Sequence, residues 1–233
     1  MPLSTSDLID ILRLDLDDPE MPGGGDDSDC LWLDSELTRF LAGAQEIVCR
    51  KLDLLFDSST YTITTDALQV DGLYDLDDDI TKVRSARVAG ARTLNVVSIA
   101  ELERQYSTYD LGWYTENWEE VTGEPKYLVT DYAVGKARLV PIPDGDAEVI
   151  QLGVYRMPVD STVMEVPNRY RREMLLYAKY KAYDKNDSDV HNEKLALKFK
   201  AEWEHALLEL DREQKIRVKN KQTTSYGGIR MSR

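Results

Sequence analysis

The first segment of the chain shows helical periodicity on both sides of a breaker. In residues 5–14, leucine and isoleucine recur at i, i+3 and i+4, which predicts a short amphipathic helix. Residues 17–29 contain two prolines and three consecutive glycines, so no helix or strand is expected there. A second helix is predicted over residues 34–54, with Asp34 as its N-cap residue, because its apolar residues keep the spacing of one buried face.

The apolar pattern changes its period in the middle of the chain. Runs rich in β-branched and aromatic residues alternate with turn residues, which predicts short strands. Ser98 and Glu101 form a capping-box sequence, so a brief helix is expected over residues 98–106. The predicted strands cover residues 60–65, 67–70, 83–88, 127–131, 137–140 and 148–155, and they indicate a small antiparallel sheet or sandwich.

The last segment is helical again. One helix is predicted over residues 168–185, and a longer one from a cap at Asp187 or Ser188 to about Val218. The short connection between them favours an antiparallel hairpin. Residues 221–233 have no periodicity and contain a Gly-Gly pair, so this basic tail is expected to be disordered when the chain is alone.

Together these patterns predict an α+β fold. N-terminal and C-terminal helices would form a helical bundle around an inserted antiparallel β module, followed by an extended C-terminal tail. The expected divisions are N-terminal helices with a Gly/Asp-rich loop, a β-rich module, a C-terminal helical hairpin and a flexible basic tail, at residues 1–56, 57–160, 161–220 and 221–233.

Charge separates the two ends of the chain. The formal net charge is -14, yet residues 1–80 carry 20 acids against 4 bases, and from Lys215 onward there are 6 bases and no acids. An acidic body argues against tight DNA binding, because DNA affinity comes mainly from cations that displace counterions. Such a body would repel DNA, while the basic end could dock on an acidic surface. The alternative is that the acidic bias only keeps the protein soluble.

Compartment and chemistry are both constrained by what the sequence lacks. No run approaches the length of a membrane span, no secretory signal begins the chain, and two cysteines, Cys30 and Cys49, make no disulfide framework. Synthesis in a reducing cytoplasm fits best. His191 and His205 lack metal-ligand spacing, and the acids of residues 75–79 do not match a calcium loop. No catalytic residue, metal or cofactor is therefore expected, and the protein is not expected to be an enzyme.

Aromatic composition points to association instead. The chain has 13 tyrosines and 4 tryptophans but only 3 phenylalanines, and Tyr and Trp are enriched where proteins meet. Trp113, Tyr114 and Trp118 lie in a polar stretch and are candidates for a ring or neighbour interface. Capping of the sheet from outside is an equally good interpretation. The tail is a second candidate, since ordering it costs on the order of 1–2 kcal/mol per residue and requires a partner.

The segment from Trp118 to Tyr183 resembles the head-to-tail adaptor proteins of tailed bacteriophages. The resemblance rests on the order of a TGxPxxY sequence, a strand, a PxPD turn, a strand ending in Tyr, and a helix. The residues that carry it are Trp118, Thr122-Gly123-Glu124-Pro125-Lys126-Tyr127, Ala137-Arg138-Leu139, Pro141-Ile142-Pro143-Asp144, Leu152-Gly153-Val154-Tyr155-Arg156, Val166-Pro167, Tyr170, Leu175 and Ala178.

The resemblance implies a structural protein at the head-tail junction of the virion. It implies a ring, commonly of twelve copies, that sits under the portal protein, joins the capsid to tail or nozzle proteins, and lines the channel through which DNA passes without specific binding. It also implies that the C-terminal segment reaches into the portal. The portal-binding candidates are Lys219, Lys221, Tyr226, Gly227, Gly228, Ile229, Arg230 and Arg233.

Three alternatives stay open at this point. The nearest is another ring of the same junction, such as a stopper or tail-tube protein, although the helical hairpin and basic tail favour the adaptor. A virion hydrolase that uses two acids is the second, but the sequence nominates no pair. The third is a cellular α+β binding module with a helical hairpin.

Overall fold

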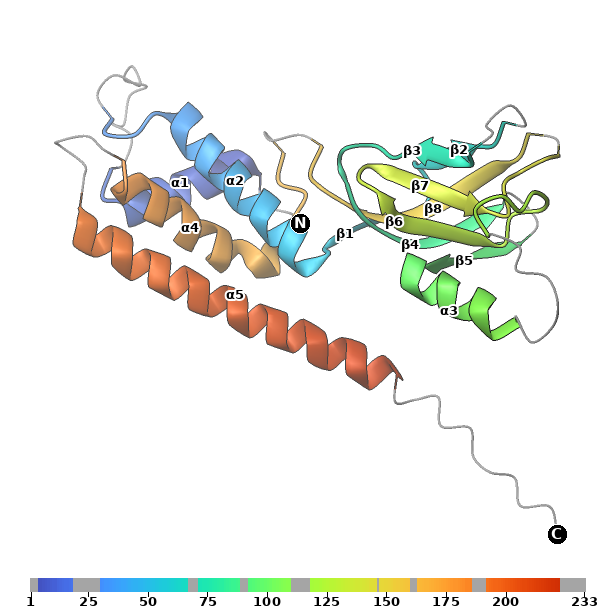
Figure 1. Cartoon of the computed structure of the whole chain (residues 1–233). Coiled ribbons are helices and arrows are strands. Elements are labelled where there is room, and N and C mark those ends of the chain that lie inside the picture. The colour runs from blue at the N-terminus through green and yellow to red at the C-terminus, as the bar shows by residue number, and fades with distance from the viewer. Residues whose placement is uncertain are drawn as a thin grey trace, which may run out of the picture. The chain divides into compact units, whose positions relative to one another are not determined.

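The computed structural model shows a mixed α+β chain, which confirms the expected class. It describes residues 4–18, 30–66, 71–88, 92–109, 118–145, 147–159, 163–185 and 192–222, with the backbone alone for residues 105–109 and 217–222 (Figure 1). The chain divides into two compact units. One combines Met1–Leu52 with Pro158–Arg233, and the other is Asp53–Met157.

The first unit is helical and takes its elements from both ends of the chain. Helix α4 packs against both α2 and α5, and α1 contacts α2 and α4. The apolar periodicity of each helix supplies the buried side, so that Leu12, Leu41 and Ala178 are wholly buried. The elements of this unit are α1 (Thr5–Asp15), α2 (Asp34–Leu52), the 3-10 turn η2 (Asn168–Tyr170), α4 (Arg171–Tyr183) and α5 (Glu193–Gln222).

A buried ion cluster joins α1 to the start of α2. Arg13 is only 2% exposed, and its Nη1 lies 3.2 Å from Asp18 Oδ2. The expectation that Asp34 caps α2 is wrong, because Asp34 is the first helical residue and its Oδ1 accepts from Arg13 Nη2 at 2.6 Å. A guanidinium taken out of water requires anionic partners, so this pairing takes the place of a capping role.

Aromatic side chains hold α4 between the start of α2 and α5. Trp32 donates from Nε1 to the Ala182 carbonyl at 3.1 Å and meets Tyr183 edge-on at 6.0 Å between ring centroids. Tyr183 stacks on Phe199 at 5.8 Å. The contacts place the end of α4 beside the start of α5, which is the antiparallel arrangement that the short connection predicts.

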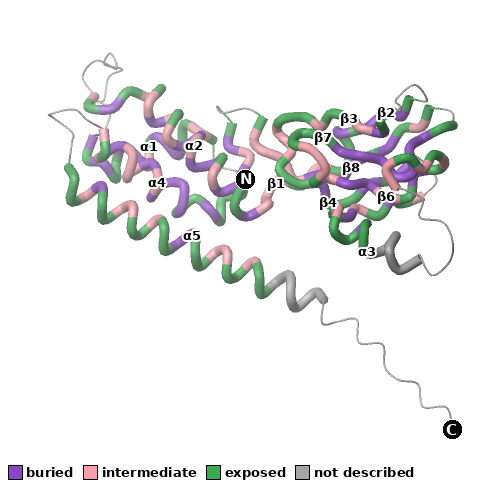
Figure 2. Tube along the Cα trace, in the orientation of Figure 1, coloured by how far each residue is buried: buried purple, intermediate pink, exposed green. Residues whose placement is uncertain are grey.

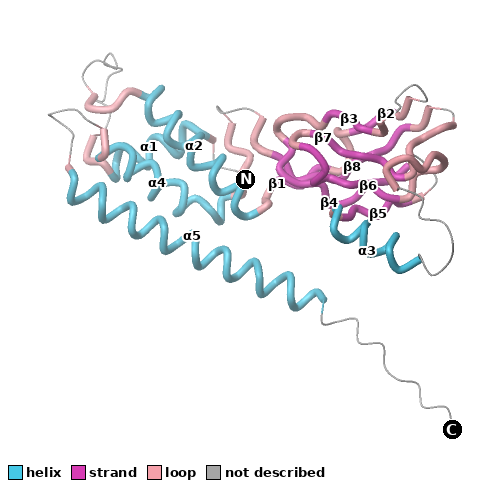
Figure 3. Tube along the Cα trace, viewed as in Figure 1, coloured by secondary structure: helices cyan, strands magenta, loops and turns pink. Residues whose placement is uncertain are grey.

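In its described residues, the second unit has a curled sheet of eight strands and one helix, α3 (Figure 3). The strand order is β1-β8-β4-β5-β6-β7-β3, and β2 also pairs with β8. Among the described residues, every pairing between two of these strands is antiparallel except β5–β6, which α3 connects as a parallel pair requires. The elements are β1 (Leu55–Asp57), β2 (Thr62–Thr64), β3 (Leu73–Asp75), β4 (Ile80–Val88), β5 (Thr93–Val97), α3 (Ile99–Tyr109), β6 (Tyr127–Ala133), β7 (Lys136–Val140) and β8 (Val149–Arg156).

Two apolar clusters stabilise this unit. The larger includes the buried residues Leu94, Leu139 and Leu152. Buried positions recur along the strands of this unit, where the trace is purple (Figure 2). The smaller contains Val97, Leu102 from α3, Val129 and Val140. Because α3 covers part of the sheet, neighbouring residues of one strand face different clusters, and β7 is buried at four successive positions.

Several element boundaries differ from the sequence-based expectation. The short strands β1 and β3 and the strand β5 were not expected, and the strand expected over residues 67–70 lies outside the described residues. Helix α5 begins at Glu193, after Asn192, whose side chain accepts from the Leu195 amide at 3.2 Å. The expected caps, Asp187 and Ser188, lie outside the described residues.

Candidate interaction surfaces

Two loops of the β unit that are distant in sequence run side by side. Thr122 forms an isolated parallel bridge with Ile142, the Gly123 amide donates to the Ile142 carbonyl at 2.8 Å, and the Ile142 amide donates to the Val121 carbonyl at 2.8 Å. These are the TGEP and PIPD sequences that carry the resemblance to phage adaptors. The two loops therefore stabilise each other, since each provides hydrogen-bond partners for backbone groups of the other.

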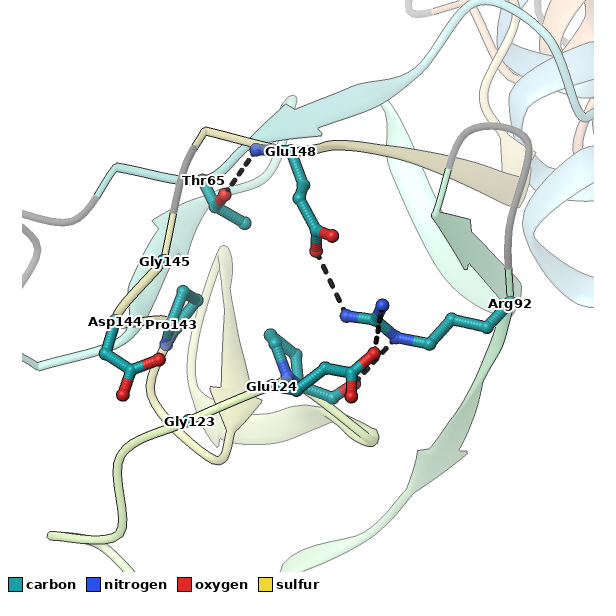
Figure 4. Close-up of a pocket in the computed structure, with 9 residues that line it drawn as sticks. Thr65, Arg92, Gly123, Glu124, Pro143, Asp144, Gly145 and Glu148 are labelled. Atoms are coloured by element: carbon teal, nitrogen blue, oxygen red, sulfur yellow. Dashed lines mark hydrogen bonds and ion pairs between the residues drawn. The ribbon is translucent and has the colours of Figure 1, made fainter.

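Beside these loops lies a polar pocket of about 260 Å³ (Figure 4). Pro143 and Asp144 lie across it from Arg92. Its lining comes from the ends of several strands: Thr65, Arg92, Gly123, Glu124, Pro125, Pro143, Asp144, Gly145 and Glu148.

Arg92 connects three parts of this lining. Its Nη2 lies 3.0 Å from Glu148 Oε2, its Nη1 forms an ion pair with Glu124, and its Nε donates to the Pro125 carbonyl at 3.4 Å. Glu148 is fixed in turn, because its amide donates to Thr65 Oγ1 at 2.8 Å. The guanidinium is thus already engaged by two carboxylates, and the arrangement ties loop ends together rather than holding a reactive group free for chemistry.

Other side chains that could bind a metal or take part in catalysis also form local contacts. Asp75 pairs with Lys136 at 3.1 Å, and Tyr61 donates a hydrogen bond to Asp79. Burial and this carboxylate together raise the pKa of Tyr61 well above its ordinary value. Within the described residues, no group of three or more His, Cys, Asp or Glu side chains has a metal-binding arrangement. His205 is exposed and lies 3.7 Å from Glu209, and His191 lies outside the described residues.

Trp118 packs on the outside of the sheet. Its ring meets Tyr132 edge-on at 6.1 Å between centroids, and the guanidinium of Arg138 lies 5.3 Å from the Trp118 ring and 4.5 Å from the Tyr132 ring. Arg138 also donates to the Glu119 carbonyl at 2.6 Å. Sheet capping therefore accounts for Trp118 inside one chain. Trp113 and Tyr114 lie outside the described residues, so the interface role of all three stays a prediction.

The C-terminal candidates divide between helix and undescribed tail. Lys219 and Lys221 belong to α5, which continues to Gln222 rather than ending near Val218. Lysine and glutamine are good helix formers, and no glycine or proline occurs between Val218 and Gly227. Cations also favour a helix C-terminus, so the helix extends past the expected end. The remaining portal-binding candidates lie outside the described residues: Tyr226, Gly227, Gly228, Ile229, Arg230 and Arg233.

One surface of α5 was not anticipated from the sequence. Leu197 and Leu208 are 58% and 50% exposed, on the side of the helix away from its buried residues. The helix was predicted from the apolar stripe over Phe199, Trp203 and Leu207 alone. The spacing of eleven residues between Leu197 and Leu208 is a signal for a second stripe on the same helix. None of the helices within the described ranges is long and apolar enough to cross a membrane.

The described surfaces thus offer ion-paired side chains and the exposed leucines of α5, which suit contacts with other proteins. The model of the SU10 adaptor protein family matches residues 3–226. The chain therefore belongs to this family of phage head-to-tail adaptors, as the resemblance indicated. A comparison with curated proteins finds no match. Family membership implies a structural role in the virion neck and association with portal and tail proteins.

Proposed function

We infer that the chain is a head-to-tail adaptor that forms a ring under the portal protein, joins the capsid to the tail and lines the DNA channel. The family match over residues 3–226 carries this proposal, because it spans both the helical and the β unit. Copies of the chain, commonly twelve, would form the ring, and tail or nozzle proteins would bind below it.

The helical unit is suited to the wall of such a ring. Helix α5 has 30 residues and so extends for about 45 Å at 1.5 Å per residue. A head-to-tail contact closes a ring only if its rotation divides a full turn, and packed helices are stiff enough to fix that angle. The aromatic contacts of Tyr183 with Trp32 and Phe199 add to the rigidity of the wall.

The basic C-terminus would bind the portal. Lys219 and Lys221 extend α5, and the segment beyond Gln222 contains Tyr226 and two further arginines but no acid. Ordering such a segment requires a foreign surface. Several tails that engage together raise the effective concentration of each, so weak single contacts sum to a permanent joint.

Truncation after Gln222 tests this part of the proposal. Co-sedimentation with the portal protein is expected to be lost, while the circular dichroism spectrum and melting temperature of the chain stay unchanged. A shuffled tail of the same composition is the matched control, since it separates sequence-specific docking from simple charge attraction. Undiminished portal binding by the truncated chain would refute tail docking.

An acidic channel wall would let DNA slide without sticking. Residues 1–80 carry 20 acids against 4 bases. Electrostatic repulsion would then prevent the counterion release on which DNA affinity depends. Electron cryomicroscopy of the assembled neck tests the idea, because acids that all face away from the channel would remove it.

The aromatic cluster would contribute to contacts with a neighbouring protein. Replacing Trp113 and Tyr114 by alanine is expected to weaken neck assembly without a change in melting temperature. Trp118→Ala is the contrasting variant, and it should lower the melting temperature because Trp118 packs on Tyr132 and Arg138. Unchanged assembly of the double variant would exclude this interface role.

A further inference from the structure

Helix α5 carries two apolar stripes, of which the chain itself covers one. The covered stripe includes Ala196, Ala206 and Leu207, which are 2–4% exposed. Leu197 and Leu208 are eleven residues apart, and at 3.6 residues per turn they point within about 20° of each other. Their exposures of 58% and 50% show that no described part of the chain packs over them.

The C-terminal half of this outer stripe carries basic residues. Arg212 and Lys215 follow Leu208 at i+4 and i+7, so all three lie on one side of the helix. Lys215 forms a 2.6 Å ion pair with Asp211 on its own helix. Arg212 is exposed and has no ion-pair partner among the described residues.

The outer side of α1 has the same spacing with the opposite charge. Leu14 is 68% exposed, and Asp10 and Asp7 precede it at i-4 and i-7. Asp7 closes the capping box with Ser4, whose amide lies 2.9 Å from its Oδ2, and Asp10 has no partner among the described residues. A leucine followed by two bases on α5 thus corresponds to two acids followed by a leucine on α1.

The two surfaces are complementary when the helices run antiparallel. Leu208 would then lie opposite Leu14, Arg212 opposite Asp10, and Lys215 opposite Asp7. We propose that the outer stripe of α5 in one copy, centred on Leu208, docks on the outer side of α1, centred on Leu14, in the neighbouring copy. This inference deepens the proposed ring and rests on it.

The directions of the helices within one chain fit this contact. The end of α1 lies beside the last turns of α4, because Asp15 pairs with Lys179 at 2.7 Å. The start of α5 lies beside the same turns, because Phe199 stacks on Tyr183. The end of α1 and the start of α5 therefore lie beside the same turns of α4, as expected of two helices that run in opposite directions. Rotation about a ring axis nearly parallel to the helices preserves that relation between neighbours.

Two copies are required for the contact. Helix α1 uses Leu8 and Leu12 to pack inside the unit, and α5 uses Phe199 and Leu207. The faces that carry Leu14 and Leu208 both point away from these buried sides. A contact between two different faces of identical chains is heterologous, which is the type that generates closed rings.

Charge exchange tests the proposed contact in the full chain mixed with its portal. Arg212→Glu is expected to reduce the yield of complete rings at least about tenfold, since a like-charge contact of roughly 1.4 kcal/mol is repeated at every interface. Asp10→Lys combined with Arg212→Glu should restore it. Lys194→Glu makes the same charge change about 27 Å away along α5 and should have no effect.

Cysteine pairing gives a second readout that does not depend on charge. One preparation carries Leu14→Cys and another carries Leu208→Cys, both with Cys30→Ser, and oxidation follows mixing on the portal. Disulfide-linked dimers are expected in the mixture and not in either preparation alone. Leu197→Cys and Val134→Cys serve as exposed positions that should not pair with Leu14→Cys.

The outcomes separate this inference from the proposed function. Rings that form normally with Arg212→Glu, and that give no Leu14–Leu208 cross-link, would overturn the interface and leave the ring proposal standing. Loss of portal binding by single copies of Arg212→Glu would show that this face meets the portal instead. Failure of the unaltered chain to form rings on the portal would overturn both.

Discussion

The side chain of Gln45 is fully buried in α2 and makes three hydrogen bonds to the segment before α4. Its Nε2 donates to the Val163 carbonyl at 3.1 Å, and its Oε1 accepts from the amides of Glu165 and Val166 at 2.7 and 3.2 Å. One polar residue thus fixes the path along which the chain returns to the helical unit. Buried polar groups specify structure because leaving any of them unpaired is costly.

Replacement of Gln45 by alanine should therefore destabilise the helical unit strongly. Three backbone groups would lose a buried partner, and the expected loss in the free energy of unfolding is about 2–4 kcal/mol. Urea denaturation followed by circular dichroism measures it. Glu46→Ala removes an exposed neighbour on the same helix and is expected to change stability by less than about 0.5 kcal/mol. Equal stabilities of the two variants would contradict the role given to Gln45.

The stability of the β unit is expected to depend on pH through Asp57. Its Oδ1 accepts from the Ser59 amide at 2.8 Å and its Oδ2 from the Thr60 hydroxyl at 2.7 Å. These hydrogen bonds, led by the one from the Ser59 amide, lower the pKa of Asp57 from 3.8 to about 2. A carboxylate with a lowered pKa stabilises the fold above its ordinary pKa and loses that contribution as the pH falls through the folded-state value.

The predicted signature is a pH-dependent difference between the wild-type chain and Asp57→Asn. Near neutral pH the variant should melt at a lower temperature, because its neutral amide is a weaker acceptor for the Ser59 and Thr60 groups. The difference should shrink between about pH 4 and pH 2, where Asp57 of the wild type becomes protonated. Thermal unfolding of both chains over this range checks it, and a constant difference would argue against the turn contacts.

At the scale of elements, β8 pairs with three of the described strands, and a glycine allows its close packing. Strand β8 pairs with β4 on one side and with β1 and β2 on the other. A Cβ added to Gly153 would overlap Ser85 Oγ and would lie 3.2 Å from the Phe56 ring. The absent side chain therefore lets Phe56 pack over the middle of the strand.

Gly153→Ala should destabilise the β unit by about 1–3 kcal/mol through overpacking. Ser85→Ala removes the hydroxyl with which the new methyl group would collide, so the substitution should cost less in that background. A double-mutant cycle from denaturant unfolding measures the coupling, which is expected to exceed about 0.5 kcal/mol. Simple additivity of the two changes would show that Ser85 is not the obstacle.

The sequence predicted those elements whose signal is repeated over several turns or residues. Helices α1, α2 and α4 extend over at least eleven residues, and their apolar sides were predicted from periodicity. Strands β4, β6 and β8 extend over at least seven residues and were predicted from runs of β-branched and aromatic residues. Strands β1 and β3 have three residues each, too few to show alternation, and they exist because β8 and β7 offer them a free edge. Strand β5 contains three β-branched residues, which favour a strand, but no strand was predicted there.

Contacts between distant residues could not be predicted from local patterns. Arg92 and Glu148 are 56 positions apart, and Arg13 and Asp34 are separated by 21. In the second case Asp34 looked like a helix cap, and only the burial of Arg13 explains its different use. The TGEP and PIPD sequences were recognised by their order along the chain. That these two loops lie side by side next to Arg92 is seen only in the folded sheet.

At the scale of the whole molecule, the chain builds a helical unit from its two ends and a β unit from its middle. Each unit has its own core, and the outer faces of α1 and α5 remain available for contacts. In an isolated copy, Leu14 of α1 and Leu197 and Leu208 of α5 are exposed. We therefore expect that the portal, which offers many equivalent binding sites, promotes assembly of the chain.

Native mass spectrometry of the chain alone and with its portal tests the central claim most directly. The predicted result is a complex in which a full ring of chain copies, commonly twelve, is bound to the portal oligomer. A monomer in the absence of the portal is compatible with that result, because the portal can act as the template. A chain that remains monomeric and unbound when the assembled portal is present would contradict the account.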